Sequence, residues 1–342
     1  MKRAGMLFEE IIARENLRLG LCKALRGKRY RSEARQFTAD AERNLRLMAE
    51  QVGVGRFPLG RYRQFVIHDP KRRTITAPCF AERVLHHAIM NVCEPVFERR
   101  LIRDSYACRV GRGRVAAVER AQRMAGKFGF FLKMDVRSYF ASISHEVLIR
   151  GLERLFKDDR LLELLEQIIR SFQVSPGRGL PIGSLTSQHF ANFYLGRFDR
   201  FVKEGLCINP YLRYMDDMLL FGHASSELDA ILVRCRAFLG QSLQLQLKPV
   251  PYINRTSHGV DFLGCRVFPD RVILNRRSRV RFQRKMFRLE EQYLRGELDE
   301  QELQERATSL VAFTRAASAR SWHFRQSVLE RLPVSGRRPP TG

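Results

Sequence analysis

The sequence predicts a mixed fold of the α/β (α+β) class, in which antiparallel strand hairpins are combined with amphipathic helices. The stretch 211–221 has the pattern of an apolar strand, a tight turn and a second apolar strand. Another apolar run, 128–132, ends shortly before an acidic residue. Apolar residues recur at helical spacing in four longer segments, namely 6–50, 80–97, 145–172 and 275–332.

Carboxylates stand at two of the predicted strand ends. Asp216 and Asp217 are adjacent in the turn of the first hairpin, and Asp135 follows the other apolar run. Aspartate is a common turn residue, and this is the simpler interpretation of an isolated Asp-Asp pair. However, adjacent carboxylates between apolar strands are costly unless positive charge neutralises them. Because a third carboxylate also stands at a strand end, we favour a site for two divalent cations that acts by in-line displacement at phosphorus.

Composition favours a polyanionic partner. The chain has 342 residues, enough for two or three domains, and carries a net charge of +25 with an isoelectric point near 10.6. An anionic membrane is the other candidate, but no apolar run reaches the roughly 18 residues of a spanning helix. The N-terminus does not resemble a signal peptide. Seven scattered cysteines without a C-x-x-C pair argue against zinc or a disulfide framework, and we expect a reducing cytoplasm.

The N-terminal third combines basic helices with a basic hairpin. Lys23–Arg31 contains an aromatic residue among cations, which suits phosphate contact, although a solvated helix face is an equal alternative. The segment Tyr62–Pro78 predicts two short strands around a Pro-containing turn. That turn carries three cations that can hold a triphosphate, and they are Lys71, Arg72 and Arg73.

The segment 80–140 contributes further candidates. His86 and His87 lie on the helix 80–97, and we interpret them as packing or surface residues. The Gly-punctuated basic loop Asp104–Arg114 can follow a nucleic-acid backbone but lacks the end of a P-loop. Phe140 stands five residues after Asp135. It can press against a nucleotide sugar or be a core residue, and these alternatives are equal without a resemblance to a known family.

A glycine-rich loop, 175–183, leads into a helix that opens at Ser184. Such a loop beside a carboxylate site can cradle an incoming nucleotide through Ile182, Gly183 and Gln188, although a purely structural helix entry is also open. Farther on, we expect a helix over 226–239 and a strand over 243–247. The strand ends at Lys248, which can protonate a leaving pyrophosphate. A hairpin is predicted over 259–264.

Cations concentrate at the start of the last helical segment. With Phe282 and Phe287 between them, they suit the backbone of a duplex better than a merely solvated face, because acids are absent until Glu290. The candidate nucleic-acid-binding residues are Arg276, Arg277, Arg279, Arg281, Arg284 and Lys285.

Taken in this order, the segments resemble those of a reverse transcriptase over roughly residues 20–330, and Tyr214-Met-Asp-Asp217 is the most specific motif. The resemblance implies a right-hand polymerase with fingers, an antiparallel-sheet palm and a helical thumb. It divides the chain into a helical basic extension (1–60), fingers and palm (61–265, with the catalytic palm about 125–265), a thumb (266–332) and a disordered tail (333–342).

The resemblance also implies a metal site and its substrates. Asp135, Asp216 and Asp217, with the backbone carbonyl of Val136, would hold two Mg²⁺ ions, for which Mn²⁺ can substitute. Phe140 would be the steric gate against the ribose 2′-hydroxyl. The basic hairpin would hold the triphosphate of a dNTP, and template RNA and a primer or cDNA strand would be the partners.

The subtype is indicated by departures from the common bacterial pattern. Ile182 stands where group II intron and retron enzymes usually have Gln, and Gln188 stands where Pro is usual. These residues, with Asp104–Arg109 and the lack of a maturase or endonuclease extension, resemble the reverse transcriptases of diversity-generating retroelements. That subtype implies cDNA synthesis from a template-repeat RNA with errors opposite adenine, and a small helical, basic accessory protein. A retron-type or antiphage-defence enzyme is the first alternative, and a non-catalytic RNA-binding protein is the second.

Overall fold

The structure is a computed structural model that describes residues 3–68, 72–314, 317 and 320–330. Two compact units are formed, and each contains segments that are far apart in the sequence. Unit 1 comprises 1–103, 136–207 and 234–248, and unit 2 comprises 104–135, 208–233 and 249–342. The boundary passes between Asp135 and Val136.

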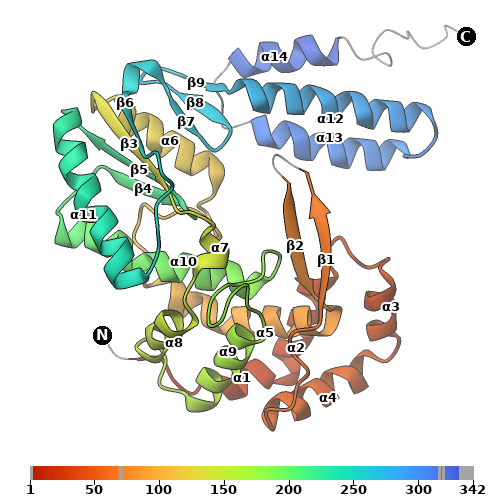
Figure 1. The fold of residues 1–342 in the computed structure, drawn as a ribbon. Coiled ribbons are helices and arrows are strands. Elements are labelled where there is room, and N and C mark those ends of the chain that lie inside the picture. Colours follow the sequence, from red (N-terminus) through yellow and green to blue (C-terminus); the bar gives the residue numbers. More distant parts are fainter. Residues whose placement is uncertain (1–2, 69–71, 315–316, 318–319, 331–342) are drawn as a thin grey trace, which may run out of the picture. The chain divides into compact units, whose positions relative to one another are not determined.

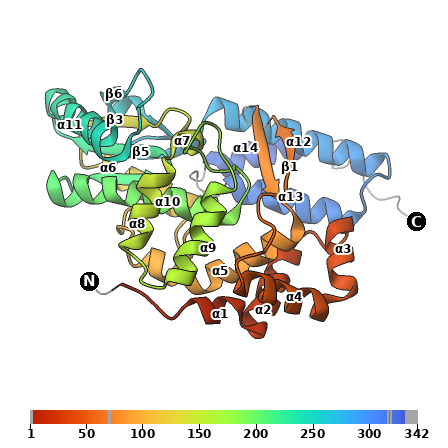
Figure 2. The same cartoon turned by 60° about the horizontal axis from the view of Figure 1, so that its bottom comes forward.

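Ahead of the long helix α5 (Phe80–Glu98), unit 1 begins with a group of shorter helices. They are α1 (Phe8–Ile12), α2 (Arg14–Leu25), α3 (Ser32–Ala39) and α4 (Ala41–Gly53). Helices α1 and α2 lie along α5 (Figures 1 and 2). Gly20 permits the close approach of α2, because a Cβ atom there would lie 2.8 Å from the carbonyl oxygen of Val84.

An antiparallel hairpin precedes α5, as the sequence predicts. Strands β1 (Tyr62–Ile67) and β2 (Arg73–Pro78) pair from Tyr62 opposite Pro78 to Ile67 opposite Arg73. The backbone N–H of Cys79 donates to the carbonyl of Arg61 at 2.8 Å and closes the base of the hairpin.

The remaining helices of unit 1 are α7 (Tyr139–Ser142), α8 (His145–Glu153), α9 (Asp159–Arg170), α10 (Leu185–Arg200) and a π-helical turn (Phe201–Gly205). The predicted helical segment 145–172 is therefore interrupted. Asp158 explains the interruption, because its carboxylate accepts hydrogen bonds from the amides of Leu161, Leu7 and Phe8 and so caps α9.

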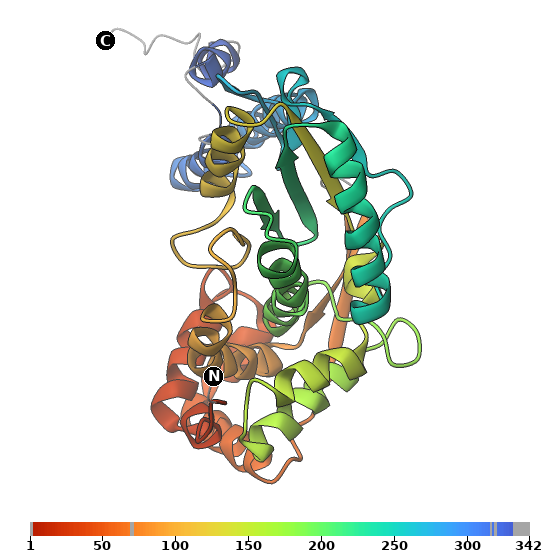
Figure 3. The same cartoon turned by 90° about the vertical axis from the view of Figure 1, so that its left-hand side faces the viewer.

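Unit 2 is built on a four-stranded antiparallel sheet in the order β4-β5-β3-β6. Its strands are β3 (Phe130–Asp135), β4 (Tyr211–Tyr214), β5 (Asp217–Gly222) and β6 (Tyr252–Arg255). Helix α6 (Arg114–Ala125) lies along one face of the sheet (Figure 3). Ala117, Val118 and Ala121 of α6 join Phe131 and Leu219 in one hydrophobic core.

A smaller antiparallel sheet also belongs to unit 2, with strands β7 (Val260–Phe262), β8 (Cys265–Val267) and β9 (Val272–Leu274). A hairpin is present where one was predicted, but it extends beyond 259–264: only β7 and the turn at Leu263 and Gly264 lie in that range, and the second strand is β8. Three helices follow, α12 (Arg276–Leu294), α13 (Glu300–Thr314) and α14 (Arg320–Leu329), and α12 lies beside α13 (Figure 1).

Helix α11 (Ser225–Leu243) corrects one expectation. It extends four residues beyond the predicted end, and the predicted strand 243–247 does not form. Leu243 and Leu245 are buried between exposed glutamines, which explains the alternating pattern, but only Leu247 forms an isolated bridge, with Val136. Gln244 has a φ of 51° and ends the helix.

The fold class is confirmed, since helices combine with antiparallel sheets. Among the described residues, no helix has the length and apolarity needed to cross a membrane.

Candidate active site

The sheet of unit 2 brings two of the three predicted carboxylates face to face. Asp135 is the last residue of β3 and pairs in register with Asp217, the first residue of β5. Side chains directly opposite in an antiparallel pair have Cβ atoms about 4.5–5.5 Å apart. Asp216 precedes Asp217 in the two-residue turn between β4 and β5. The expected concentration of negative charge at neighbouring strand ends is therefore present.

The turn that carries these aspartates is strained. Met215 has a φ of 56°, a left-handed conformation that favours glycine and costs about 1–3 kcal/mol for other residues. Arg213, on β4, donates from Nη1 to the carbonyl oxygen of Met215 at 3.0 Å. Arg213 has 0% relative exposure and is among the largest fully buried side chains. We infer that its guanidinium holds the turn in this conformation.

Residues 104–106 extend the support of β4. The amide of Arg213 donates to Asp104, and the amide of Tyr106 donates to Arg213, at 2.9 and 3.0 Å. The Asp104 carboxylate accepts two hydrogen bonds from Arg120 of α6, at 2.9 and 3.2 Å, and these raise the pKa of Arg120. The backbone beside the turn that carries Asp216 is thus tied to α6 through a charge-assisted pair.

Lys133 supplies positive charge on the carboxylate side of the sheet. It lies two residues before Asp135 on β3, and its Nζ is 3.2 Å from Oδ1 of Asp217. The same Nζ donates to the carbonyl of Asp261 at 2.8 Å. Sequence reasoning assigned no role to Lys133 or to Arg213. The available signal was a cation inside each apolar strand that leads to an aspartate.

The donor groups at these strand ends bear on metal binding. In the described part of the chain, no three His, Cys, Asp or Glu side chains are gathered closely enough to hold a metal ion. The donor chemistry fits Mg²⁺, because carboxylate oxygens are its preferred protein ligands and two of the three aspartates are opposite in register.

The predicted nucleotide loop and hairpin meet within unit 1. The amide of Thr76 on β2 donates to the carbonyl of Ile182 at 2.7 Å. Gly183 has a φ of +125°, and a Cβ atom there would lie 2.7 Å from Cγ2 of Ile75. Glycine is therefore required at this contact. The Ile182 side chain is 36% exposed, and Gln188 is exposed on α10.

Two other predicted nucleotide contacts lie in the same unit. Phe140 is half-buried on α7, and its carbonyl accepts from the amide of Leu180 at 2.8 Å, in the loop that leads to Gly183. Arg72 and Arg73 are exposed at the start of β2, whereas Lys71 lies outside the described residues.

Lys248 is placed by the pairing of its neighbour. Val136, which follows Asp135 in the chain, forms a bridge with Leu247, and the amide of Arg137 donates to Gln246 at 2.8 Å. Lys248 is exposed directly after this bridge. Val136 is 1% exposed, so only its backbone is suited to the role predicted for it.

Helix α12 carries the predicted nucleic-acid-binding residues and buries a stripe of Ser278, Phe282, Met286 and Glu290. Arg281 is half-buried and stacks over the ring of Phe313 at 4.9 Å. The other predicted nucleic-acid-binding residues are exposed, and they are Arg276, Arg277, Arg279, Arg284 and Lys285.

The loop 104–114, for which contact with a nucleic-acid backbone is predicted, begins with buried residues and continues with half-buried and exposed ones. Asp104, Ser105 and Tyr106 are buried, so the first half of the loop packs in the core of unit 2. Arg114 donates to the carbonyls of Leu263 and Phe313 and joins α6 to the β7–β8 turn and to α13.

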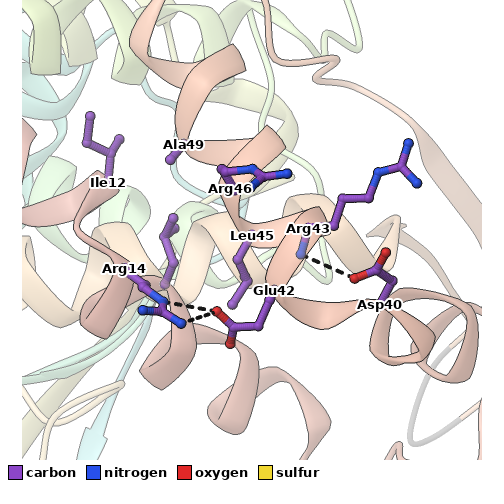
Figure 4. Close-up of a pocket in the computed structure, with 9 residues that line it drawn as sticks. Ile12, Arg14, Asp40, Glu42, Arg43, Leu45, Arg46 and Ala49 are labelled. Atoms are coloured by element: carbon purple, nitrogen blue, oxygen red, sulfur yellow. Dashed lines mark hydrogen bonds and ion pairs between the residues drawn. The ribbon is translucent and has the colours of Figure 1, made fainter.

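A separate cavity of about 640 Å³ lies among the N-terminal helices (Figure 4). Arg14 and Glu42 form an ion pair of 2.7 Å at its edge. The cavity contains no predicted site residue, and its lining residues are Ile12, Arg14, Leu17, Asp40, Glu42, Arg43, Leu45, Arg46 and Ala49.

Comparison with known families decides the affiliation. Residues 68–267, which include all three aspartates, match the model of the reverse transcriptase (RNA-dependent DNA polymerase) family. The chain belongs to the reverse transcriptase family. The matched region of this reverse transcriptase contains the turn Tyr214–Asp217. It also contains strand β2, the Gly183 loop and Lys248.

Relatives of this reverse transcriptase include bacterial proteins. It is 25% identical over 248 residues to protein YkfC of Escherichia coli (strain K12). The aligned region covers 59% of this chain and 64% of YkfC. It is also 25% identical over 141 residues to the group II intron-encoded protein LtrA of Lactococcus lactis subsp. cremoris. This aligned region covers 40% of this chain and 24% of LtrA. The chain thus spans less than two thirds of these relatives.

The fold of this reverse transcriptase is similar to that of apo telomerase from Candida tropicalis. The TM-score is 0.52 at 11% identity, and the match covers 80% of this chain and 62% of that chain. This likeness supports the polymerase fold.

Proposed function

We propose that the protein is an RNA-directed DNA polymerase that extends a primer on an RNA template. The observation that best supports this proposal is the strand register, which sets Asp135 opposite Asp217. The adjacent turn is strained and accepts a hydrogen bond from Arg213. The chain also belongs to the reverse transcriptase family. Template RNA, a primer or cDNA strand and dNTPs are the partners and substrates of this activity.

In this proposal, Asp135, Asp216, Asp217 and the carbonyl of Val136 would hold two Mg²⁺ ions. When bound, the ions lower the pKa of the primer 3′-hydroxyl and neutralise charge that develops on the phosphoryl group. The protein itself contributes mainly positioning and electrostatics. Lys133 balances part of the aspartate charge before the substrates bind, since its Nζ lies 3.2 Å from Asp217.

Residues of unit 1 select and orient the nucleotide. Arg72 and Arg73, with Lys71, hold the triphosphate by charge-assisted hydrogen bonds. Phe140 excludes the ribose 2′-hydroxyl, and Lys248 donates a proton to the leaving pyrophosphate. The hydrogen bond between Thr76 and Ile182 supports these roles, because it fixes the hairpin to the nucleotide loop.

We further propose that the enzyme acts in a diversity-generating retroelement. It would copy a template-repeat RNA with errors opposite adenine and would work with a small helical, basic accessory protein. Ile182 supports this subtype, because an exposed isoleucine cannot donate a hydrogen bond near the nucleotide as glutamine can. Correct and incorrect pairs would then differ less in transition-state energy, and a loss of about 1.4 kcal/mol is tenfold in fidelity.

A retron-type, group II intron-like or antiphage-defence enzyme is the second candidate. The similarity to the intron-encoded protein LtrA favours it. A template repeat and an accessory gene beside the coding sequence would decide for the retroelement.

Sequencing of the cDNA distinguishes these proposals. Primer extension on an RNA template with all four bases, with and without a co-expressed accessory protein, is expected to give errors concentrated opposite adenine. A low and even error rate would retain the polymerase but contradict the retroelement subtype. RNA binding without any product would favour a non-catalytic RNA-binding protein.

A further inference from the structure

Unit 1 contains a pair of buried polar side chains that the proposed chemistry does not use. Glu82 and His86 lie one turn apart on α5, with relative exposures of 0% and 1%. Glu82 Oε1 and His86 Nε2 are 3.6 Å apart, and neither atom has a hydrogen-bond partner among the described residues. Buried polar atoms are rarely left in this state, because each costs about 1–3 kcal/mol when unsatisfied.

The other polar atoms of this pair reach two elements of the candidate nucleotide site. Oε2 of Glu82 accepts from the amide of Gly60 at 3.1 Å, and the carboxyl also accepts from the amide of Arg61. These residues stand at the start of β1, so Glu82 anchors the base of the hairpin.

On the other side, Nδ1 of His86 lies 3.1 Å from Oγ of Ser184, which is 3.0 Å from Oγ1 of Thr186. Ser184 and Thr186 are 1% and 0% exposed and form the entry to α10, directly after Gly183. The hydrogen bond from the amide of Thr76 to the carbonyl of Ile182 connects the same two elements close to this point, two residues before the base of the hairpin at Pro78.

Proton positions in this network follow from burial. Burial raises the pKa of Glu82 to about 7, and burial together with the charges of His87 and Arg83 lowers the pKa of His86 to about 3. Near pH 7, His86 is therefore neutral and Glu82 is protonated in a large fraction of the molecules. A protonated Glu82 can donate to Nε2 of His86, whose Nδ1–H then donates to Ser184, so a small approach of the pair satisfies both open atoms.

We propose that Glu82 and His86 are positioning residues that hold the base of the β1–β2 hairpin and the Gly183 loop in one frame, and that this frame sets the affinity for the incoming dNTP. The inference rests on the proposed polymerase function for its kinetic consequence. The frame itself is a property of unit 1 and can be measured without catalysis.

The kinetic test compares Glu82→Ala, Glu82→Gln and His86→Ala in primer extension. We expect the alanine variants to raise KM for dNTP about tenfold and to change kcat by less than about threefold. Glutamine should stay within about twofold of the wild type, because its carbonyl accepts from Gly60 and its amide donates to His86. His189→Ala is the matched control, since it removes another buried histidine of unit 1 from α10.

The structural test is amide hydrogen exchange over 60–78 and 180–186. Both alanine variants should accelerate exchange in these two segments together, whereas His189→Ala should not. Unchanged exchange in the alanine variants, or a Glu82→Gln variant as defective as Glu82→Ala, would overturn the inference. An inactive wild type with these exchange changes would instead contradict the polymerase proposal and leave the frame supported.

Discussion

Single side chains decide the geometry of the candidate site, and Arg213 is the clearest case. It is fully buried and donates to the carbonyl of Met215, the left-handed residue of the turn that carries Asp216 and Asp217. Without this donor, the turn would lose its hydrogen bond, and the carbonyl of Met215 would lose its charged partner.

We therefore predict that Arg213→Met lowers kcat at least tenfold while KM for dNTP changes less, and that it costs about 3 kcal/mol of unfolding free energy. Arg213→Lys should recover part of the stability, because lysine keeps the positive charge. The recovery should be partial, because a point charge replaces the planar fork of the guanidinium. Single-turnover extension and urea denaturation measure the two effects. If kcat of Arg213→Met stays within twofold of the wild-type value, the turn keeps its conformation without Arg213.

Glu82 gives a prediction at the same scale for pH. Its pKa is about 7 in the folded protein, above the ordinary value of 4.5, so the folded state binds the proton more tightly. Its contribution to stability is therefore present below about pH 4.5 and is lost as the pH rises toward 7. His86, with a lowered pKa of about 3, acts in the opposite sense between pH 3 and 6.5 and partly masks it.

Glu82→Gln removes only the first of these two contributions. We expect the stability of this variant, relative to wild type, to increase by about 3 kcal/mol between pH 4.5 and 7.5. Chemical denaturation of both proteins across this range measures the difference. A difference that does not change with pH would mean that Glu82 has an ordinary pKa in the folded state.

Some of these residue roles follow from sequence and others do not. Asp216 and Asp217 are expected in a turn from the apolar runs around them. The burial of Arg213 is not, because arginine is rarely buried and because β4 is covered by the segment 104–106, which is distant in sequence and forms an isolated bridge with Arg213 through Ser105. The position of Asp135 opposite Asp217 likewise depends on the register between β3 and β5. Local sequence patterns do not determine the register of strands that are distant in sequence.

At the scale of elements, the junction of β2 with the Gly183 loop leaves no room for a side chain. A Cβ atom at Gly183 would lie 2.7 Å from Cγ2 of Ile75 and 3.2 Å from the carbonyl oxygen of Thr76, at a φ of +125°. Any side chain there must displace either the hairpin or the loop.

We expect Gly183→Ala to raise KM for dNTP about tenfold or more and to destabilise the protein by about 1–3 kcal/mol. Gly177→Ala is a suitable control, because Gly177 also has a positive φ, +66°, but has open space around its Cβ position. Steady-state kinetics and thermal unfolding of the two variants provide the comparison. Equal effects in both would assign the loss to backbone strain alone.

The predictability of elements follows their length and periodicity. The β1–β2 hairpin and α5 carry clear patterns and were predicted. Strands β6 and β9 are short and were missed, since their existence depends on pairing with β3 and β8. The alternation in 243–247 was misassigned as a strand, because buried leucines alternate there without a partner strand.

For the molecule as a whole, the net charge of +25 predicts strong, salt-dependent binding of nucleic acid. The sequence identified the charge and the family resemblance, but not the division into two units. That division depends on contacts between distant segments, since each unit gathers three separate stretches of chain.

We predict that the exposed cations of α12 contact a duplex. Arg284→Gln combined with Lys285→Gln should lower the slope of log affinity against log salt by about 2 for a primer–template duplex. Arg234→Gln combined with Arg236→Gln on α11 removes the same charge from another exposed helix and should change the slope little. Fluorescence anisotropy at several salt concentrations gives both slopes, and equal slopes would contradict a specific role for α12.

The central claim is that Asp135, Asp216 and Asp217 form a metal-dependent nucleotidyl-transfer site. The most direct measurement is Mg²⁺-dependent extension of a DNA primer on an RNA template, with Asp216→Asn beside the wild type. The account predicts cDNA that requires Mg²⁺ in the wild type and at least a thousandfold loss of rate in Asp216→Asn, with primer–template binding retained. Extension by Asp216→Asn at a rate close to that of the wild type would contradict it.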